Sequence, residues 1–359
     1  MITVRKLTES DQEAYEAFLA GHAHSLFYHS NRFRLFLRAL LDANDHYLLA
    51  IEDGDIVGAL PAFRVHSPLG SSLNSLPFFG SNGGIITSRG REQVQRELLR
   101  NWLDLAAEGQ TLAANLITSP FENHPAIYTR FLEQEPADYR IGQVSELPFG
   151  NQKNAAQGAE GAAEEELFAA LEPFTRRMIR KATKKQMRVE EKNDAEALHF
   201  LADIHAQNMN QIGGKKKPGA FFNKLSQFFR ARDDYKIWTA WHGDKMVAAL
   251  LLFFYNRTVE YYIPAIVHEY RSYQPQSLIV YRAMLDAAAN GYRYWNWGGT
   301  WPSQEGVYRF KKQWNTQNKY YYYYHILCDK TLLDHSREEI QKAFPYSYVV
   351  PFKRIETSR

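Results

Sequence analysis

The feature that most limits the fold is a repeat of the chain upon itself at a spacing of 182 residues. The segment RNWLDLAAEG (100–109) aligns without a gap with RAMLDAAANG (282–291). Two amphipathic helices can share two or three positions by chance, but here six agree. The identical pairs are Arg100/Arg282, Leu103/Leu285, Asp104/Asp286, Ala106/Ala288, Ala107/Ala289 and Gly109/Gly291. So long a period indicates two copies of a whole domain and not a solenoid of short repeats.

The elements around these helices come in the same order in both halves. Two apolar stretches flank a tight turn at Asp53–Asp55 and again at His242–Asp244, which predicts a β-hairpin in each half. Both hairpins continue into Val-X-Ala-Leu, at Val57–Leu60 and Val247–Leu250. Each copy is therefore predicted to run strand, helix, helix, hairpin, strand, helix, strand.

This order predicts an α/β protein with mixed sheets (α+β) and two tandem domains. The clearest change in composition is PFGNQKNAAQGAEGAA, at 148–163, which is poor in large apolar residues. We interpret it as a surface loop or linker. The predicted limits are 1–150 for the first domain, 151–165 for the linker and 166–359 for the second domain with a C-terminal tail.

Composition excludes several classes of protein. The net charge of the 359 residues is only +3, so the whole chain is not a general polyanion binder, and we expect no DNA partner. A single cysteine, Cys328, rules out an intrachain disulfide framework and fits a reducing compartment. Neither a secretory signal nor a long apolar span is visible, so we expect a cytoplasmic protein, with contact at a membrane surface left open. The histidines are scattered without metal-site spacing, and no metal is expected.

The stretch richest in chemistry is GYRYWNWGGTWPSQEGVYRFKKQW, Gly291–Trp314. Alternating aromatic and polar residues predict a strand over Tyr292–Trp297, and Gly298-Gly299 then predict a break where a ligand could approach closely. A short amphipathic helix follows and brings Phe310 and Lys311 back towards the end of the strand.

These motifs resemble the FemAB/FemX-type peptidyltransferases and the related BioF2-like acetyltransferases, which are tandem-domain members of the GNAT superfamily. The resemblance rests on the hairpins, the helix ending in Ala-Ala-X-Gly, WNWGGT…EGVYRFKKQW, FTRRMIRKATKKQMRVEE and LPFFGSNGGI. It extends over most of the chain, from about Ser25 to Tyr324, and implies two GNAT-like domains that transfer an acyl or aminoacyl group to an amine. In the Fem branch the donor is an aminoacyl-tRNA and the acceptor is a peptidoglycan precursor.

By this resemblance the Phe-Lys pair of the Fem branch falls on Phe310 and Lys311. The lysine would hold the carbonyl or the RNA end of the donor, and its positive charge would stabilise the oxyanion of a tetrahedral intermediate. Lys312 points about 100° away on a helix, so only one of the two lysines can lie beside an inward Phe310. With Gly298 and Gly299 at the end of the strand, these residues form the predicted site.

Two features depart from the family pattern. No stretch is long enough for the helical hairpin that some Fem ligases insert into the second domain. The usual GNAT phosphate loop would fall on Arg271–Gln276, where Gln274 and Gln276 replace both glycines and Pro275 removes an N–H donor. A phosphate cradle needs free backbone N–H groups, so this loop argues against an ordinary acetyl-CoA enzyme.

Amine acylation also needs a proton acceptor. Glu305, in the loop after the glycines, is the first candidate; Asp286, His268 and Glu269 are the others. Tyr261, Tyr262 and Tyr273 are candidates for an acceptor groove, although tyrosines on strands also serve as packing.

Seven basic residues and no acid lie in Arg176–Arg188, which predicts a helix with a basic stripe. The stripe is either a solvated face or a phosphate-contacting surface, and Arg177 and Arg180 are the residues to test. The loop GGKKKP, Gly213–Pro218, is interpreted as a mobile surface turn, with a substrate lid as the alternative.

The leading hypothesis is an acyl- or aminoacyltransferase that acts on an amino group of a cell-wall or exopolysaccharide precursor or of an amino sugar. The donor would be aminoacyl-tRNA or acyl-CoA, so tRNA and a lipid- or nucleotide-linked glycan are the expected partners. The alternatives are an acyl-CoA-dependent N-acetyltransferase and a non-catalytic subunit that binds a glycan or peptide.

Overall fold

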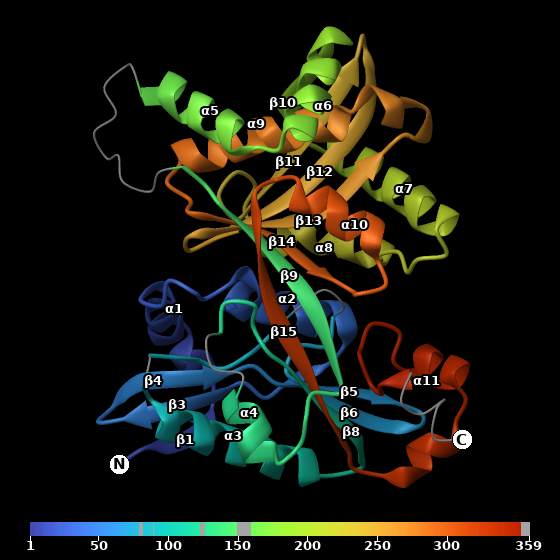
Figure 1. The fold of residues 1–359 in the computed structure, drawn as a ribbon. Helices are drawn as coiled ribbons and strands as arrows, with labels where there is room; N and C mark the ends of the chain where they lie inside the picture. Colours follow the sequence, from blue (N-terminus) through green and yellow to red (C-terminus); the bar gives the residue numbers. More distant parts are fainter. Residues whose placement is uncertain (79–81, 89, 123–125, 149–158, 353–359) are drawn as a thin grey trace. The chain divides into compact units, whose positions relative to one another are not determined.

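The computed structural model describes residues 1–78, 82–88, 90–122, 126–148 and 159–352. It divides the chain into two compact units: residues 1–141 with 319–359, and residues 142–318. Two strands, β9 (Asp138–Glu146) and β15 (Thr316–Leu327), have residues in both units. The units therefore have other limits from the sequence-based domains, because β15 carries the chain back and residues 319–352 pack with the first half (Figure 1).

The first unit contains two sheets. One is antiparallel, in the order β1-β3-β4-β7; the other places β8 beside β15 and β6, followed by β5 and β2. Its further strands are β1 (Thr3–Lys6), β2 (Asn44–Asp45), β3 (Leu48–Glu52), β4 (Asp55–Leu60), β5 (Phe63–Ser67), β6 (Gly70–Asn74), β7 (Ile86–Thr87) and β8 (Thr111–Ile117). Its helices are α1 (Gln12–Ala20), α2 (Asn31–Leu41), α3 (Glu92–Ala107), α4 (Ala126–Leu132) and α11 (Arg337–Ala343).

The core of the first unit forms around α3. Val94, Leu98 and Trp102 recur at helical spacing on its buried face and pack with residues from β3, β4 and β8. The C-terminal residues have a core of their own, in which Leu332, Ile340 and Phe344 pack against β8.

The second unit is built on one sheet in the order β10-β11-β12-β13-β14, followed by β9. Its strands are β10 (Met187–Glu191), β11 (Tyr235–His242), β12 (Lys245–Tyr255), β13 (Thr258–Ile266) and β14 (Tyr294–Thr300). Its helices are α5 (Ala159–Ala170), α6 (Pro173–Lys184), α7 (Ala195–Gln211), α8 (Gly219–Phe228), α9 (Pro275–Ala289) and α10 (Glu305–Lys312).

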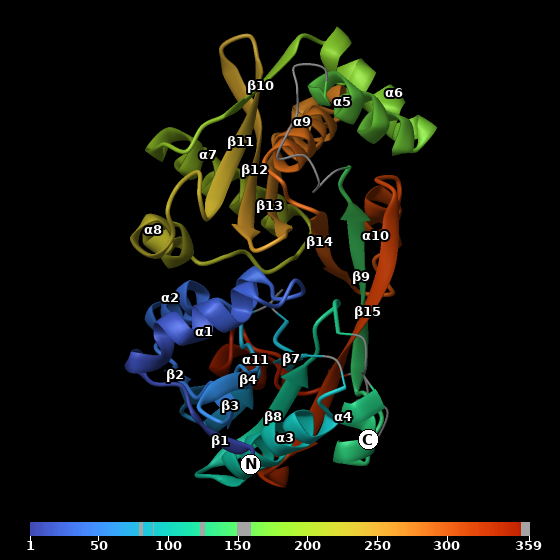
Figure 2. The same cartoon turned by 90° about the vertical axis from the view of Figure 1, so that its left-hand side faces the viewer.

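Helices cover both faces of the second unit's sheet, with α9 on one side and α7 on the other (Figure 2). Alternation along β12 explains why both faces are apolar. Leu250, Leu252 and Phe254 pack into the core with α9, whereas the intervening Phe253 contacts Phe229.

The predicted duplication is visible in the structure. Both units run strand, two helices, hairpin, strand, helix, strand: β1 to β8 in the first and β10 to β14 in the second, with β2, β5 and β6 added to the first. Gly109 and Gly291 follow α3 and α9 with φ of 66° and 83°, as expected for left-handed residues just after a helix. The expected α/β fold with mixed sheets, in two units that share one order of elements, is confirmed.

Part of the predicted linker is helical. Residues 149–158 lie outside the described part of the chain, but α5 already begins at Ala159. The glycine and alanine content that favoured a loop is compatible with a helix here, because Ala is the strongest helix former.

Candidate active site in the second unit

The candidate site lies where β13 and β14 stop pairing. The two strands are parallel, and their register joins Thr258–Glu260 to Tyr294–Asn296. Beyond these residues β13 continues to Ile266 and β14 to Thr300, with no further cross-strand pair between them in the described chain. In α/β sheets, ligands bind at the carboxyl ends of neighbouring strands at such points.

A β-bulge adds to this opening. The register between β12 and β13 shifts at Leu251/Leu252, which leaves Tyr262 as the extra residue on β13. Bulges re-aim a side chain and are common beside functional sites.

The two glycines do not end the strand as predicted. β14 runs through Gly298 and Gly299 to Thr300. Gly298 has a φ of 70°, and its N–H donates to Asn296 Oδ1 over 3.0 Å, so the strand bends without losing this hydrogen bond. A Cβ at Gly298 would meet no atom within 4 Å, so the glycine is required by its backbone angle and not by crowding.

A buried carboxylate and amide join the two strands at their last paired residues. Asn296 Nδ2 donates to both oxygens of Glu260, at 2.9 and 3.2 Å, and both side chains are almost fully buried. Sequence reasoning missed this pair. The available signal was a single polar residue between two tryptophans, Trp295 and Trp297, on a strand whose other face is also covered.

Lys311 lies inside this site. It is only 6% exposed, and its Nζ donates to Thr300 Oγ1 over 2.9 Å. Longer contacts of 3.4 and 3.5 Å reach the carbonyl oxygens of Gly298 and Gly299. The ammonium therefore lies at the end of β14, at the bend that Gly298 makes.

Phe310 and Lys312 explain which lysine points inwards. The Phe310 ring lies 6.1 Å from Trp297 and 6.4 Å from Trp314, which anchors α10 against the core. Lys312, one residue on, is exposed and reaches Thr316 O over 3.3 Å. The neighbouring pair is thus a natural comparison between a buried and an exposed ammonium.

The loop GGKKKP is not a mobile surface turn throughout. Lys215 and Lys216 are exposed, but Lys217 is buried. Its backbone N–H donates to His205 Nε2 over 3.2 Å, and its Nζ donates to Tyr262 Oη at the bulge over 3.2 Å. Burial holds the pKa of Lys217 well below its ordinary value. The three lysines are indistinguishable in the sequence, and only tertiary contacts single out the third.

Other predicted residues lie apart from Lys311. Glu305 is exposed in the first turn of α10 and pairs with Arg309 over 2.9 Å. Asp286 accepts from Lys236 Nζ over 2.5 Å, and His268 and Glu269 belong to a 3-10 turn before α9. These contacts are structural or solvent-facing, and none of them joins the candidate base Glu305 to the buried cation.

The predicted groove tyrosines have separate environments. Tyr261 packs 5.0 Å from Trp297, and burial raises the pKa of its hydroxyl. Tyr273 instead meets His242 at 5.4 Å, with Lys185 Nζ 5.0 Å from its ring. Arg177 and Arg180 are exposed on α6. Whether these residues bind substrate stays a prediction.

The phosphate-loop position keeps an unusual backbone. Gln274 adopts φ 65°, the left-handed conformation that glycine takes most easily, and Pro275 begins α9. The turn before α9 is therefore left-handed although no glycine stands there, and Pro275 gives the first helical residue no N–H.

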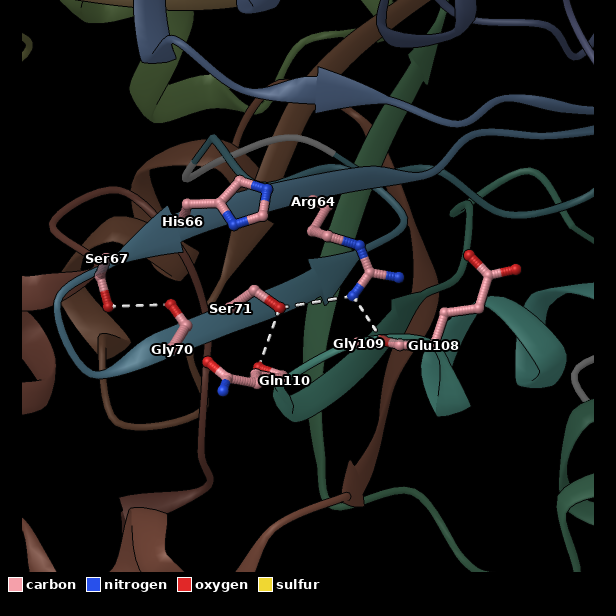
Figure 3. Close-up of a pocket in the computed structure, with 8 residues that line it drawn as sticks. All are labelled: Arg64, His66, Ser67, Gly70, Ser71, Glu108, Gly109 and Gln110. Carbon is pink, nitrogen blue, oxygen red and sulfur yellow. Dashed lines mark hydrogen bonds between the residues drawn. The ribbon is translucent and has the colours of Figure 1, made fainter.

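The position in the first unit that corresponds to Lys311 does not hold a cation. The repeat spacing places Thr129 opposite Lys311, and its hydroxyl lies 2.9 Å from Tyr324 Oη. A pocket of about 400 Å³ in this unit is lined by Arg64, His66, Ser67, Gly70, Ser71, Glu108, Gly109 and Gln110 (Figure 3). Arg64 there donates to Glu108 O over 3.0 Å and to Leu105 O over 2.6 Å. Its guanidinium thus satisfies carbonyls at the end of α3, which is a structural role.

A second pocket of the first unit contains a half-buried acid. Glu122 accepts from Tyr128 Oη over 2.8 Å, and burial raises the pKa of its carboxyl to about 8. Sequence reasoning did not select this residue, and nothing in its neighbourhood on the chain marks it as half-buried.

The described residues contain neither a candidate metal site nor a candidate membrane-spanning helix. Within the described residues, no group of three or more His, Cys, Asp or Glu is arranged to hold a metal ion. Among the helices of the same residues, none has both the length and the apolar character needed to cross a bilayer.

Comparison with known proteins agrees with this arrangement. Residues 174–312, which include α6, Lys217 and Lys311, match the acetyltransferase (GNAT) domain family. A comparison of the sequence with curated proteins found no significant match.

Similarity to solved structures extends over nearly the whole chain. The crystal structure of FemX superimposes with a TM-score of 0.69 at 12% identity, covering 92% of this chain and 99% of FemX. A tandem GNAT protein from the clavulanic acid biosynthesis pathway gives 0.56 at 9% identity, with 92% and 99% covered. The C-terminal domain of a putative lysylphosphatidylglycerol synthetase from Agrobacterium fabrum gives 0.51 at 9% identity, with 90% and 92% covered. Residues 174–312 thus carry a GNAT acetyltransferase domain, so the chain is an acyltransferase, and its fold is similar to that of FemX over nearly the whole chain.

Proposed function

We propose that the second unit transfers an aminoacyl or acyl group from an activated donor to an amino group of a cell-wall or exopolysaccharide precursor or of an amino sugar. The observation that carries this proposal is the buried ammonium of Lys311 at the end of β14. A cation held away from water interacts strongly with negative charge that develops beside it.

The chemistry follows from the electrostatics. The lone pair of the acceptor amine attacks the donor carbonyl, whose oxygen becomes an oxyanion. Lys311 would meet this oxygen by exchanging its long contacts to Gly298 and Gly299 carbonyls, at 3.4 and 3.5 Å, while Thr300 Oγ1 holds the ammonium in place. Collapse of the intermediate breaks the bond to the leaving group of the donor, which takes up the proton lost by the amine nitrogen, and leaves an amide. The bend at Gly298 would let the donor carbonyl approach, because no side chain occupies that position.

The donor is proposed to be an aminoacyl-tRNA. Pro275 removes one N–H from the start of α9, and glutamines stand where the phosphate loop of acyl-CoA enzymes has glycines. Acyl-CoA is the second candidate, because Gln274 keeps the left-handed backbone of that loop.

The proton acceptor is proposed to be Glu305, as the sequence indicated. Its carboxylate is exposed and pairs with Arg309 over 2.9 Å, so an incoming ammonium would compete with Arg309 for it. Glu305→Gln would then lower turnover at a pH where the acceptor amine is mostly charged, and would matter less at higher pH.

A donor and acceptor screen tests the function. The purified chain is incubated with acetyl-CoA or with charged tRNA, each with UDP-linked muropeptides or with glucosamine, and new amides are detected by mass spectrometry. Acylation of an amino group from either donor is expected. Binding of an acceptor without any new amide, over all pairs, would instead favour the non-catalytic binding subunit.

A further inference from the structure

Helix α6 presents a cationic face that the proposed chemistry does not use. We define this face by the six residues Arg176, Arg177, Arg180, Lys181, Lys184 and Lys185. At 100° per residue they cover half of the helix circumference. The buried residues Thr175, Ile179 and Ala182 lie at the centre of the opposite half. The core therefore occupies one side of α6; on the other side Arg176 is half-buried and the remaining five cations are exposed.

These charges are not neutralised within the chain. In the described residues, no carboxylate lies within ion-pair distance of any of the six, whereas the neighbouring Arg188 pairs with Glu190. Glu164 of the adjacent α5 binds Tyr281 and Arg282 instead. Four pairs on the face stand at i,i+4 spacing, where like charges destabilise a helix. An anionic partner outside the chain would relieve that repulsion.

An exposed aromatic ring lies on the same face. Phe174 is 45% exposed, and its position on the helix falls within the half circle of the cations. The Arg177 guanidinium lies 5.1 Å from the ring centroid. A row of cations with a protruding apolar ring is typical of helices that lie at the surface of an anionic membrane.

The shape of the face favours a lipid surface over a nucleic acid. Residues 176–185 form a straight convex ridge about 14 Å long. Proteins that bind single-stranded RNA use a groove with stacking platforms, and neither of the two described pockets includes a residue of α6. A flat array of lipid phosphates, in contrast, can contact all six charges together.

We propose that the cationic face of α6 docks the protein on anionic phospholipid headgroups, with Phe174 inserted among them. Docking of this kind is peripheral and reversible, and it depends on salt. It is independent of the proposed acyl transfer, since neither Lys311 nor the strand ends take part.

Vesicle sedimentation tests this proposal. The full chain is mixed with vesicles of phosphatidylcholine, with or without phosphatidylglycerol, and the bound fraction is measured over a range of salt. The test variant reverses three charges of the face: Arg177→Glu, Arg180→Glu and Lys184→Glu. The control variant reverses three exposed lysines elsewhere: Lys216→Glu, Lys330→Glu and Lys342→Glu. Both variants shift the net charge from +3 to −3, because each substitution changes it by −2.

The expected result is retention on anionic vesicles only, lost at high salt. Each cation near such a surface contributes about a fivefold factor in partitioning, so the test variant should bind roughly 100-fold more weakly than the control. Phe174→Ser should weaken binding without changing the salt dependence. Equal loss in both charge variants, binding to neutral vesicles, or loss of tRNA binding in the test variant with its vesicle binding unchanged would each overturn the proposal. Urea unfolding of both variants checks that they fold.

Discussion

The substitution Asn296→Asp should show how strongly water is excluded from the candidate site. Asn296→Asp removes both hydrogen bonds to Glu260, at 2.9 and 3.2 Å, and places two carboxyl groups in contact. Both side chains are buried, so the two groups cannot both ionise and one of them must hold a proton. Keeping a carboxyl of ordinary pKa, about 4, protonated at pH 7 costs about 4 kcal/mol, whereas the cost at pH 5 is about 1.4 kcal/mol.

Urea unfolding at the two pH values measures this difference. The free energy of unfolding of Asn296→Asp should lie about 4 kcal/mol below that of the wild type at pH 7, and the gap should narrow by about 2.7 kcal/mol at pH 5. Asn290→Asp is the matched control, because Asn290 also donates to a carboxylate, Asp286, over 3.2 Å but on the surface. Its cost should stay below about 1 kcal/mol. A loss in Asn296→Asp no larger than in the control, with no dependence on pH, would refute a shared, water-excluded contact between Glu260 and Asn296.

Two further predictions concern single residues. Gly298→Ala should lose about 1–2 kcal/mol of stability, because its φ of 70° is strained for any side chain. Gly306→Ala, inside α10, should instead gain about 0.5–1 kcal/mol of stability. Equal changes in the free energy of unfolding of the two variants, measured in urea, would contradict the assigned bend. The second concerns Glu122, whose carboxyl has a pKa raised to about 8 by burial, so the folded state binds the proton more tightly than the unfolded one. Stability of the wild type should therefore fall as pH rises from about 4.5 to about 8, by up to about 5 kcal/mol, and Glu122→Gln should abolish this slope; an unchanged slope would argue against the raised pKa.

The sequence predicted the elements that local pattern determines. The hairpin turn at Asp53-Gly54 has positive φ at both residues, as the turn chemistry requires, and Gly109 and Gly291 end their helices as predicted. The 182-residue repeat led correctly to two units of one element order, because a duplicated domain keeps its amphipathic pattern. These features depend on neighbours along the chain.

Features that depend on distant partners were not predictable. β15 pairs with β8 through residues such as Tyr324 and Leu116, about 200 positions apart, and this pairing draws the C-terminal residues into the first unit. The strand break expected at Gly298 does not occur, because Asn296 Oδ1 accepts a hydrogen bond from the Gly298 N–H at the bend. In the sequence Lys217 cannot be distinguished from Lys215 and Lys216, because its burial depends on contacts with the distant residues His205 and Tyr262.

In the candidate site, too, some residues could be predicted from the sequence and others depend on distant partners. Lys311 could be selected from a resemblance, and its burial between Thr300 and the glycine carbonyls agrees with the assigned chemistry. The Glu260–Asn296 contact that joins the strand ends could not be selected, because its two members come from strands separated by α9.

The central claim is that the buried ammonium of Lys311 stabilises charge during acyl transfer. Single-turnover rates of Lys311→Met and Lys312→Met, at a saturating concentration of the donor found in the screen, test it most directly. Both variants lose one lysine from the same helix, but only the first removes the buried cation. Loss of one oxyanion-stabilising group lowers the rate by about 100- to 1,000-fold, so Lys311→Met should fall by that factor while Lys312→Met stays near the wild type. Equal rates in the two variants would contradict the account.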